Sequence, residues 1–581
     1  MTVAPLRGTP KPPITSGSLD ASSRGALDAA VAGLKARQAD WVAVSVAGRI
    51  ALLDELLHGV LDVADRWTAA CLAAEGLDPS HPSAGEEALV GPYFILRNLR
   101  LLKKSLAGIS AGGTPKIPGP VKTLPSGQVS ARVFPQDLYD RIFYTGVTAE
   151  VWMEPGVTAA NLADTQAVAY KKKDDGGVCL VLGGGNVSSI GPMDALYKLF
   201  VDNRVVVYKV HPVNVYLGPL LEEGFRALID RGFLRQVYGG AAEGAYLCAH
   251  PEVDEIHITG SDKTYEAIVF GPGSAGETRK RENRPILTKP VTAELGNVSP
   301  VIVVPGPWSE GDLAYHAENL VTMLTNNAGF NCNATRVIVT DAGWSQRESL
   351  LGKVKEILAR VPTRKAYYPG AADRYAAFLA QHPEAEQFGE TQGEHLAWAL
   401  IPGLDSARRD EICYTTEAFC GLFGETPLAA PSIPAFLEKA VAFANESLWG
   451  TLNATLLVHP KSLQDPAVAR AVETAIADLR YGTVAVNHWA AIGYGLVITP
   501  WGAYPGHEPT DIQSGTGVVH NTLMFSRVEK SVVRAPFRVL PKPVWFATHR
   551  TAHKLTPKLS RFEAAPSLAK LPGIFSLALR G

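Results

Sequence analysis

The pattern of hydrophobic positions changes near residue 178. Before this point, residues 23–106 show Ala- and Leu-rich segments with a helical period, interrupted at Gly76-Leu77-Asp78-Pro79, which predicts a helical N-terminal layer. Residues 108–127 are dense in Gly, Pro and Ser, and we expect them to form an extended surface loop.

From residue 178, short apolar runs alternate with helical patterns. Runs at 178–182, 205–208 and 255–258 predict buried strands, with helices at 192–200 and 217–231 between them. This alternation is typical of a doubly wound parallel sheet, in which ligands bind at the carboxyl ends of the strands. No internal repeat is visible, which excludes a solenoid or a propeller.

Composition narrows the class of protein. A chain of 581 residues with 46% hydrophobic residues is expected to form two or more domains. Lys and Arg total 55 against 57 Asp and Glu, so no global charge points to nucleic acid, and a small molecule is the expected partner.

The cysteines and the hydropathy pattern indicate a compartment. Six cysteines are scattered, and Cys413 and Cys420 have neither a CxxC spacing nor nearby histidines in the sequence, so we expect no disulfide framework and no metal. Residues 1–18 lack an apolar signal core, and no segment approaches the roughly 20 apolar residues that a bilayer span needs. We therefore expect a soluble, cytoplasmic protein.

Two segments carry candidate chemistry. Cys332 follows the turn Asn327-Ala328-Gly329-Phe330-Asn331, and Glu294 lies 38 residues upstream in an apolar setting where burial would raise its pKa toward that of a general base. A cysteine considered alone is more often buried and structural, but this pairing favours a nucleophile with its base. Attack of the thiol on a carbonyl group would create an oxyanion that needs donors, and the side-chain amide of Asn186 and the backbone N–H of Cys332 can supply them.

These segments, in this order, resemble the aldehyde dehydrogenase superfamily over roughly residues 140–540. The resemblance makes Cys332 the nucleophile, Glu294 the base and Asn186 the oxyanion asparagine, although the family's Pro-Trp before that asparagine is replaced by Gly184-Gly185.

The resemblance also implies a dinucleotide site. Lys209 matches the lysine that binds the adenosine ribose, and Gly260-Ser261 matches the helix start that receives the pyrophosphate. Glu417 matches the glutamate that holds the nicotinamide ribose, with Phe419 beside the cofactor, and Gly296 is assigned to the same site.

The fold that the resemblance implies is an α/β fold with a Rossmann-like doubly wound dinucleotide domain, a second α/β catalytic domain and a small β extension for oligomerisation into a homodimer or homotetramer. The expected boundaries are a disordered N-terminus (1–22), the dinucleotide domain with its helical layer (23–290, with about 140–160 in the extension), the catalytic domain (291–490), return strands and extension (491–540) and a basic apolar tail (541–581).

Cofactor choice stays open between NAD and NADP. Many relatives carry a glutamate three residues after the ribose-binding lysine, and here that position is Pro212, so the electrostatic bar to a 2′-phosphate is absent and Lys209 or His211 could favour it. The stretch 271–290, with Arg279, Lys280, Arg281 and Arg284, is interpreted as a solvated surface loop rather than a phosphate site.

The C-terminal segment is much more basic than the rest of the chain. Residues 530–581 contain ten Lys or Arg and one acid, Glu563, a net +9, whereas the whole chain is −2. Its alternating apolar residues could lie on an anionic membrane or guard an apolar substrate entrance. We favour the alternative that it packs on an acidic surface of its own or a partner subunit.

The sequence therefore predicts NAD(P)-dependent oxidation of an aldehyde to a carboxylic acid through a thioester on Cys332 that Glu294-activated water hydrolyses. The apolar tail and a group of aromatic residues suggest a bulky or long-chain aldehyde; these residues are Trp489, Tyr494, Trp501 and Tyr504. We assign His488 no role in proton transfer. One alternative is an acyl-CoA reductase, because residues 183–187 resemble fatty-acyl reductases. Another is a catalytically silent binding or structural protein, which the intact motif residues disfavour.

Overall fold

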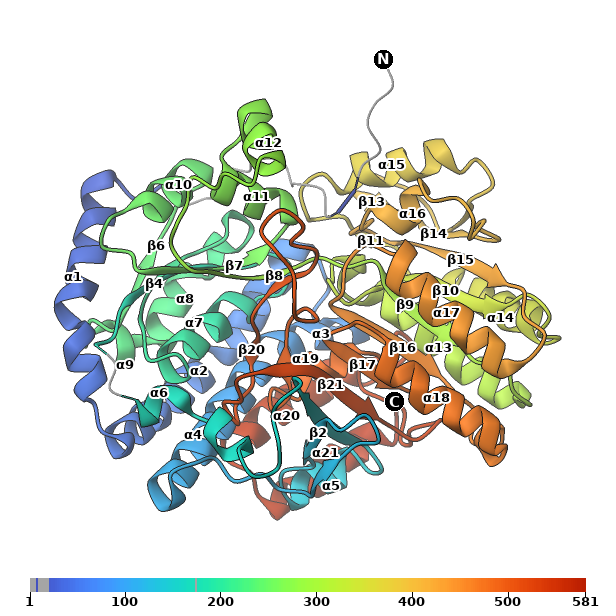
Figure 1. The fold of residues 1–581 in the computed structure, drawn as a ribbon, viewed down its shortest axis with the longest axis horizontal. Coiled ribbons are helices and arrows are strands. Elements are labelled where there is room, and N and C mark those ends of the chain that lie inside the picture. Colours follow the sequence, from blue (N-terminus) through green and yellow to red (C-terminus); the bar gives the residue numbers. More distant parts are fainter. Residues whose placement is uncertain (1–6, 9–19, 173–174) are drawn as a thin grey trace.

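The computed structural model describes residues 7–8, 20–172 and 175–581. Most of the predicted disordered segment, residues 1–22, lies outside the described residues. Figure 1 shows two sheet-based lobes, one on the left and one on the right, with a helical layer on the left and lower side.

The helical layer is confirmed. It consists of α1 (Arg24–Ala43), α2 (Val46–Glu75), α3 (Gly85–Ala88), a π-helical turn η2 (Leu89–Tyr93) and α4 (Phe94–Gly112). The Ser23 and Ser45 hydroxyls cap α1 and α2, and Gly76 ends α2 with φ 68°. The expected loop at 108–127 is partly wrong, because α4 runs on to Gly112 and β1 (Val121–Thr123) begins a sheet edge.

The left lobe holds a six-stranded sheet in the order β19-β8-β7-β4-β5-β6. All neighbours are parallel except β19 against β8. The strands are β4 (Val178–Leu182), β5 (Val205–Lys209), β6 (Leu234–Val237), β7 (Glu255–Gly260), β8 (Val291–Leu295) and β19 (Gly515–Thr516). The helices are α7 (Ile190–Phe200), α8 (Gly218–Gly224), α9 (Arg226–Ile229), α10 (Ala241–Ala249), α11 (Asp262–Phe270) and α12 (Gly273–Arg281).

Three local expectations need correction here. β6 was missed because its central residues, Arg235 and Gln236, are polar and only half-buried. The helix at 217–231 is split between α8 and α9. The expected boundary at residue 290 is displaced, since β8 pairs with β7 and extends this sheet to Leu295.

The right lobe is built on an eleven-stranded sheet in the order β1-β2-β3-β21-β17-β16-β9-β10-β15-β14-β12. Its central run from β21 to β14 is parallel, and the pairs at both edges are antiparallel. The strands are β2 (Val129–Phe134), β3 (Thr148–Met153), β9 (Ser299–Val303), β10 (Thr335–Asp341), β12 (Glu386–Phe388), β14 (Trp398–Ile401), β15 (Leu422–Leu428), β16 (Asn453–Leu457), β17 (Thr483–Val486) and β21 (Val528–Arg534).

Helices on this lobe are α13 (Glu310–Thr325), α14 (Arg347–Leu358), α15 (Ala371–Gln381), α16 (Ile412–Thr415), α17 (Ile433–Ser447), α18 (Pro466–Asp478) and α19 (Ala491–Gly495). Two short pairs, β11 (Arg364–Lys365) with β13 (His395–Leu396) and β18 (Pro500–Trp501) with β20 (Val519–His520), join loops. Short helices α5 (Leu138–Phe143) and α6 (Val168–Lys171) flank β3. The expected extension segments supply β3 and β21, which pair with each other, and its role in oligomerisation stays a prediction.

The basic tail packs on its own chain. It forms α20 (Ala552–Ala564) and α21 (Leu571–Ala578), and α20 contacts α3, η2 and α4, in the lower part of Figure 1. Several of its cations meet acidic side chains, in the pairs Arg534–Glu473, Arg538–Asp312, Lys542–Glu318 and Arg561–Asp65. Within the described ranges, no helix has both the length and the apolar character that crossing a membrane requires.

Candidate active site

Cys332 and Glu294 come from different lobes and meet between them. Glu294 lies near the carboxyl end of β8, and Cys332 lies in the turn between η5 (Asn326–Gly329) and β10. The thiol and the carboxyl group lie close enough to affect each other's pKa. Both line a cavity of about 830 Å³. The structure therefore brings together the two residues on which the predicted chemistry depends.

The turn before Cys332 has an unusual backbone. Asn327 and Ala328 both have φ 51°, and Gly329 has φ 83°, a left-handed conformation that costs non-glycine residues roughly 1–2 kcal/mol each. A Cβ on Gly329 would lie 2.6 Å from the Cys420 carbonyl. The Arg336 guanidinium ties the two segments, donating to Gly329 O at 2.6 Å and Cys420 O at 2.7 Å.

Hydrogen bonds fix this turn to the loop that carries Asn186. The Asn327 side-chain amide donates to Asn186 O at 2.6 Å, and the Tyr367 hydroxyl donates to the same oxygen at 3.0 Å. The Glu86 carboxylate accepts from Asn327 N at 2.9 Å. Because each group holds another, the nucleophile and the oxyanion candidate are positioned as one unit.

The Asn186 side chain is already partly engaged. Its amide nitrogen donates to Phe330 O at 2.8 Å. An amide NH₂ carries two donors, so one N–H remains for an oxyanion.

Electrostatics around the thiol favour protonated groups. Burial raises the pKa of Glu294 to about 8, although the Trp501 indole, which donates to its carboxylate at 3.0 Å, opposes this rise. Burial also raises the pKa of Cys332 well above its usual value, and the charges of Glu294 and Glu417 add to the effect. The thiol is therefore not a preformed thiolate and needs a neighbouring base to become a nucleophile.

The predicted dinucleotide-binding residues line one cavity. Its walls include Lys209, Gly260, Ser261, Gly296, Glu417 and Phe419. The N-terminal ends of α10 and α11 open into it through Gly240–Ala242 and Ser261. Helix N-termini attract anions, nothing lies closer than 3.7 Å to where a Cβ on Gly260 would stand, and the volume is typical of cofactor sites. These residues fit a dinucleotide.

The structure changes the expected balance of charge near Lys209. Burial lowers the pKa of Lys209 to about 8, and burial together with the Lys209 charge lowers the pKa of His211 to about 3. His211 is therefore neutral near pH 7, and the expectation that it favours a 2′-phosphate by charge is wrong. Of the basic residues in 271–290, Arg279, Lys280, Arg281 and Arg284 make local contacts, as in Lys280–Glu266 at 2.6 Å, and do not line this cavity. Lys289 from the same stretch does line it.

A second, smaller space touches the same thiol. This apolar chamber has a volume of about 80 Å³, and its lining includes Trp489 and Tyr494. Among the residues that the structure describes, Cys332 and Asn186 alone line both the chamber and the larger cavity. Of the other aromatic residues noted in the sequence, Trp501 holds Glu294, whereas Tyr504 lines different hollows.

Several residues that organise the site were missed. Trp501 was noted only as an aromatic residue, and Glu86, Tyr367 and Arg336 were not singled out. Each acts across a large sequence separation, which a local motif does not reveal.

One negative expectation also needs revision. Cys413 does have a histidine neighbour in space, since possible ligand atoms of His382, Glu411 and Cys413 all lie within 4.8 Å of one another. His382 is clamped between Glu384 at 2.8 Å and Glu411 at 2.7 Å, and Arg408 approaches Glu411 at 3.3 Å. We interpret the cluster as an ion-pair network, in which the hydrogen bond to Glu411 raises the pKa of His382.

Comparisons with known proteins agree with this geometry. The model of the aldehyde dehydrogenase family matches residues 143–370. A curated relative, 4-trimethylaminobutyraldehyde dehydrogenase A of Danio rerio, is 26% identical over 361 residues, which cover 58% of this chain and 63% of the relative. The chain thus aligns with less than two thirds of that relative's length.

Solved structures show the same fold. A putative aldehyde dehydrogenase from Burkholderia cenocepacia superposes with a TM-score of 0.59 at 19% identity, covering 89% of this chain and 93% of that one. Aldehyde dehydrogenase C from Pseudomonas syringae, solved with NAD+ and octanal, gives a TM-score of 0.59 at 17% identity and coverage of 93% and 96%. With the family match over residues 143–370 and the shared α/β architecture, these findings show that the chain is similar to aldehyde dehydrogenases in part of its sequence and in its fold.

Proposed function

We propose that the protein oxidises an aldehyde to a carboxylic acid with NAD or NADP. The observation that carries this proposal is the position of Cys332, beside Glu294 and at the junction of a dinucleotide-sized cavity and an apolar chamber. An aldehyde in the chamber and a cofactor in the cavity would meet at the thiol.

The residues can perform the chemistry in order. Glu294 takes the proton of Cys332 as sulfur attacks the carbonyl carbon, and the free N–H of Asn186 and the Cys332 backbone N–H stabilise the oxyanion. A bound NAD(P)+ supplies the hydride acceptor. After passing the first proton to solvent, Glu294 takes a proton from water, whose oxygen attacks the thioester carbon. The C–S bond then breaks, the acid is released, and the Cys332 sulfur takes the proton back from Glu294.

Other residues would hold the cofactor. Lys209 would bind the adenosine ribose, the α11 start at Gly260-Ser261 would receive the pyrophosphate, and Glu417 with Phe419 would hold the nicotinamide end; all of them line the same cavity. Glu294 and Glu417 are the only carboxylates among the described residues that line this cavity. Glu243 lies outside the lining but close enough to Lys209 for its charge to raise the pKa of that lysine, so an acid and a cation both act near Lys209. This supports leaving both NAD and NADP in the proposal.

Acyl-CoA reductase chemistry is the second candidate. A thioester on Cys332 can pass to CoA as well as to water, and Glu294 could take the proton of either acceptor. Its buried position beside the thiol supports water activation, because a base with a pKa of about 8 is suited to deprotonating water near neutral pH.

The test is the absorbance of reduced nicotinamide during incubation with a set of aldehydes and NAD or NADP, with and without CoA, for the wild type and Cys332→Ala. Turnover without CoA that the variant lacks supports the dehydrogenase. Turnover only with CoA would move the assignment to the reductase, and silence throughout would contradict both.

A further inference from the structure

The apolar chamber beside Cys332 has a composition that limits its ligand. Its aromatic lining residues are Tyr93, Phe94, Tyr144, Trp489, Tyr494 and Trp545. No Asp, Glu, Lys or Arg occurs among the described residues that line it, and burial lowers the pKa of its one histidine, His488, to about 4, so it is neutral. A charged substrate group would lose its hydration there without a partner.

The rings form a wall rather than an open cation cage. Tyr494 packs against Phe94, Trp501 and His520, with ring centroids 5.5, 5.8 and 4.2 Å away. Tyr144 already has the Arg97 guanidinium 5.8 Å from its ring centroid. Since neighbouring groups occupy these rings, the chamber suits a neutral apolar group better than a quaternary ammonium.

Trp545 is the one residue of the tail (541–581) in this lining. Its ring lies 5.2 Å from that of His488. The next two residues anchor it, because Phe546 is buried with its ring 5.1 Å from Tyr315 and Ala547 N donates to Thr322 at 2.9 Å. Trp545 itself is only half-buried, as are Phe94 and Tyr144 of the same lining, so it is one of the residues where the chamber meets the surface.

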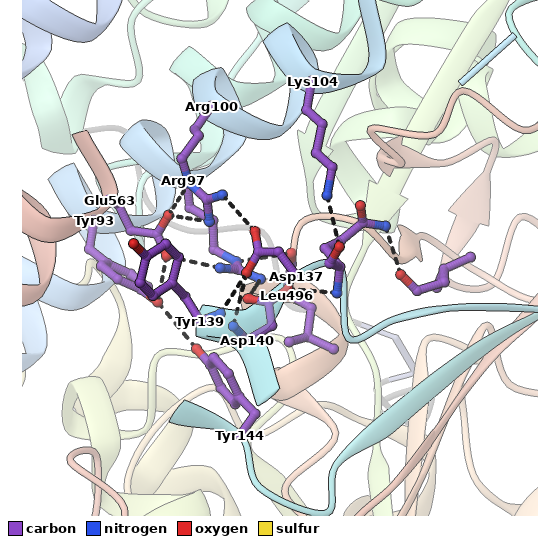
Figure 2. Close-up of polar contacts among 12 residues, drawn as sticks. Tyr93, Arg97, Arg100, Lys104, Asp137, Tyr139, Asp140, Tyr144, Leu496 and Glu563 are labelled. Carbon is purple, nitrogen blue, oxygen red and sulfur yellow. Dashed lines mark hydrogen bonds and ion pairs between the residues drawn. The ribbon is translucent and has the colours of Figure 1, made fainter. Parts of the chain in front are cut away.

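A buried polar network fixes the tail to the same wall, as Figure 2 shows. Glu563 of α20 accepts from Arg97 at 2.8 Å and pairs with Arg100 at 2.7 Å, and Arg97 also pairs with Asp140 at 2.9 Å. The Tyr93 hydroxyl lies 3.4 Å from Glu563 and 3.2 Å from the Tyr144 hydroxyl. Tyr93 of the chamber lining therefore contacts the carboxylate that anchors α20 directly, and Tyr144 is linked to it through Tyr93.

We propose that Trp545 is a specificity-determining residue that closes the outer end of the chamber and makes the protein select compact, neutral, apolar aldehydes. The proposal rests on the proposed oxidation of aldehydes. The chamber holds only about 80 Å³, and removing the indole extends it outward on the side of the tail, which gives a longer alkyl chain room.

The experiment compares kcat/KM for propanal, hexanal and decanal in the wild type and in Trp545→Ala. The decanal-to-propanal ratio is expected to rise at least about tenfold in the variant, since each methylene accommodated in an apolar pocket is worth roughly 10-fold or more. Trp545→Leu, which keeps an apolar filler, is expected to give a smaller rise and supplies the comparison if the alanine variant does not accumulate. Leu540→Ala, in the same region and 76% exposed, is the control expected to keep the wild-type ratio.

The outcomes separate the two proposals. An active wild type whose ratio is unchanged by both Trp545 substitutions overturns this inference alone. A wild type that prefers a trimethylammonium aldehyde to hexanal overturns the neutral substrate class. Silence of the wild type with every aldehyde overturns the proposed function and this inference with it.

Discussion

Trp501 tests the electrostatics of the proposed base. Its indole N–H donates to the Glu294 carboxylate at 3.0 Å and stabilises the ionised form, which lowers a pKa that burial raises to about 8. Trp501→Phe keeps a ring in the space and removes the donor. A hydrogen bond to a charged group contributes roughly 1.5–3 kcal/mol, and about 1.36 kcal/mol corresponds to one pKa unit, so the Glu294 pKa should rise by about 1–2.

The expected rise in the Glu294 pKa determines how activity should depend on pH. Glu294 must be ionised to accept a proton, so a higher pKa leaves less active base at pH 7, and kcat/KM there should fall roughly 10-fold or more while recovering at higher pH. The assay is the pH profile of kcat/KM for the wild type and the variant. Trp344→Phe, which loses an indole donor to Gly306 O elsewhere, is the matched control. A profile that keeps its position in Trp501→Phe, or drops equally at all pH values, would refute the reasoning.

Three further changes have expected outcomes. Glu563→Ala removes one carboxylate partner from each of Arg97 and Arg100, which keep Asp140 and Asp137 respectively, and should reduce the free energy of unfolding by about 3–5 kcal/mol in urea titrations. A loss below about 1 kcal/mol would show that the network does not hold the tail. Gly329→Ala places a Cβ 2.6 Å from the Cys420 carbonyl, so it should abolish turnover and change the rate of Cys332 alkylation by iodoacetamide. Gly352→Ala, whose Cβ would have nothing within 4 Å, should change neither turnover nor the alkylation rate. Lys209→Met should weaken dinucleotide binding about 10- to 100-fold in calorimetry, and Lys280→Met, outside the cavity, should not; equal affinities would place the cofactor elsewhere.

The sequence predicted the parts of this molecule that depend on local pattern. Continuous apolar runs identified β4, β5 and β7, because strands buried on both faces need apolar residues at every position. The same rule failed for β6, whose middle residues are polar and half-buried. The candidate residues Cys332, Glu294 and Asn186 carried motifs of their own, and the structure brings all three together.

The remaining organisation depends on contacts between distant segments. Trp501 reaches Glu294 across 207 residues, and Arg97 reaches Glu563 across 466. Glu563 stands as a single acid in a basic tail, and nothing nearby in the sequence shows that it is buried against arginines of α4. The neutrality of His211 likewise follows from burial, which the flanking residues do not specify.

The most direct test of the central claim is to trap the thioester. Glu294→Gln keeps the size of the side chain and removes the base, so intact-mass and peptide mass spectrometry after incubation with NAD(P) and hexanal should show an acyl group on Cys332 that the wild type releases rapidly. To form the thioester at all, the variant is incubated at high pH, where the thiol can lose its proton to solvent. An acyl group on Cys332 of Glu294→Gln, absent without cofactor, is the predicted result; acylation of another residue, or a variant that hydrolyses the adduct as fast as the wild type, would contradict the assignment of nucleophile and base.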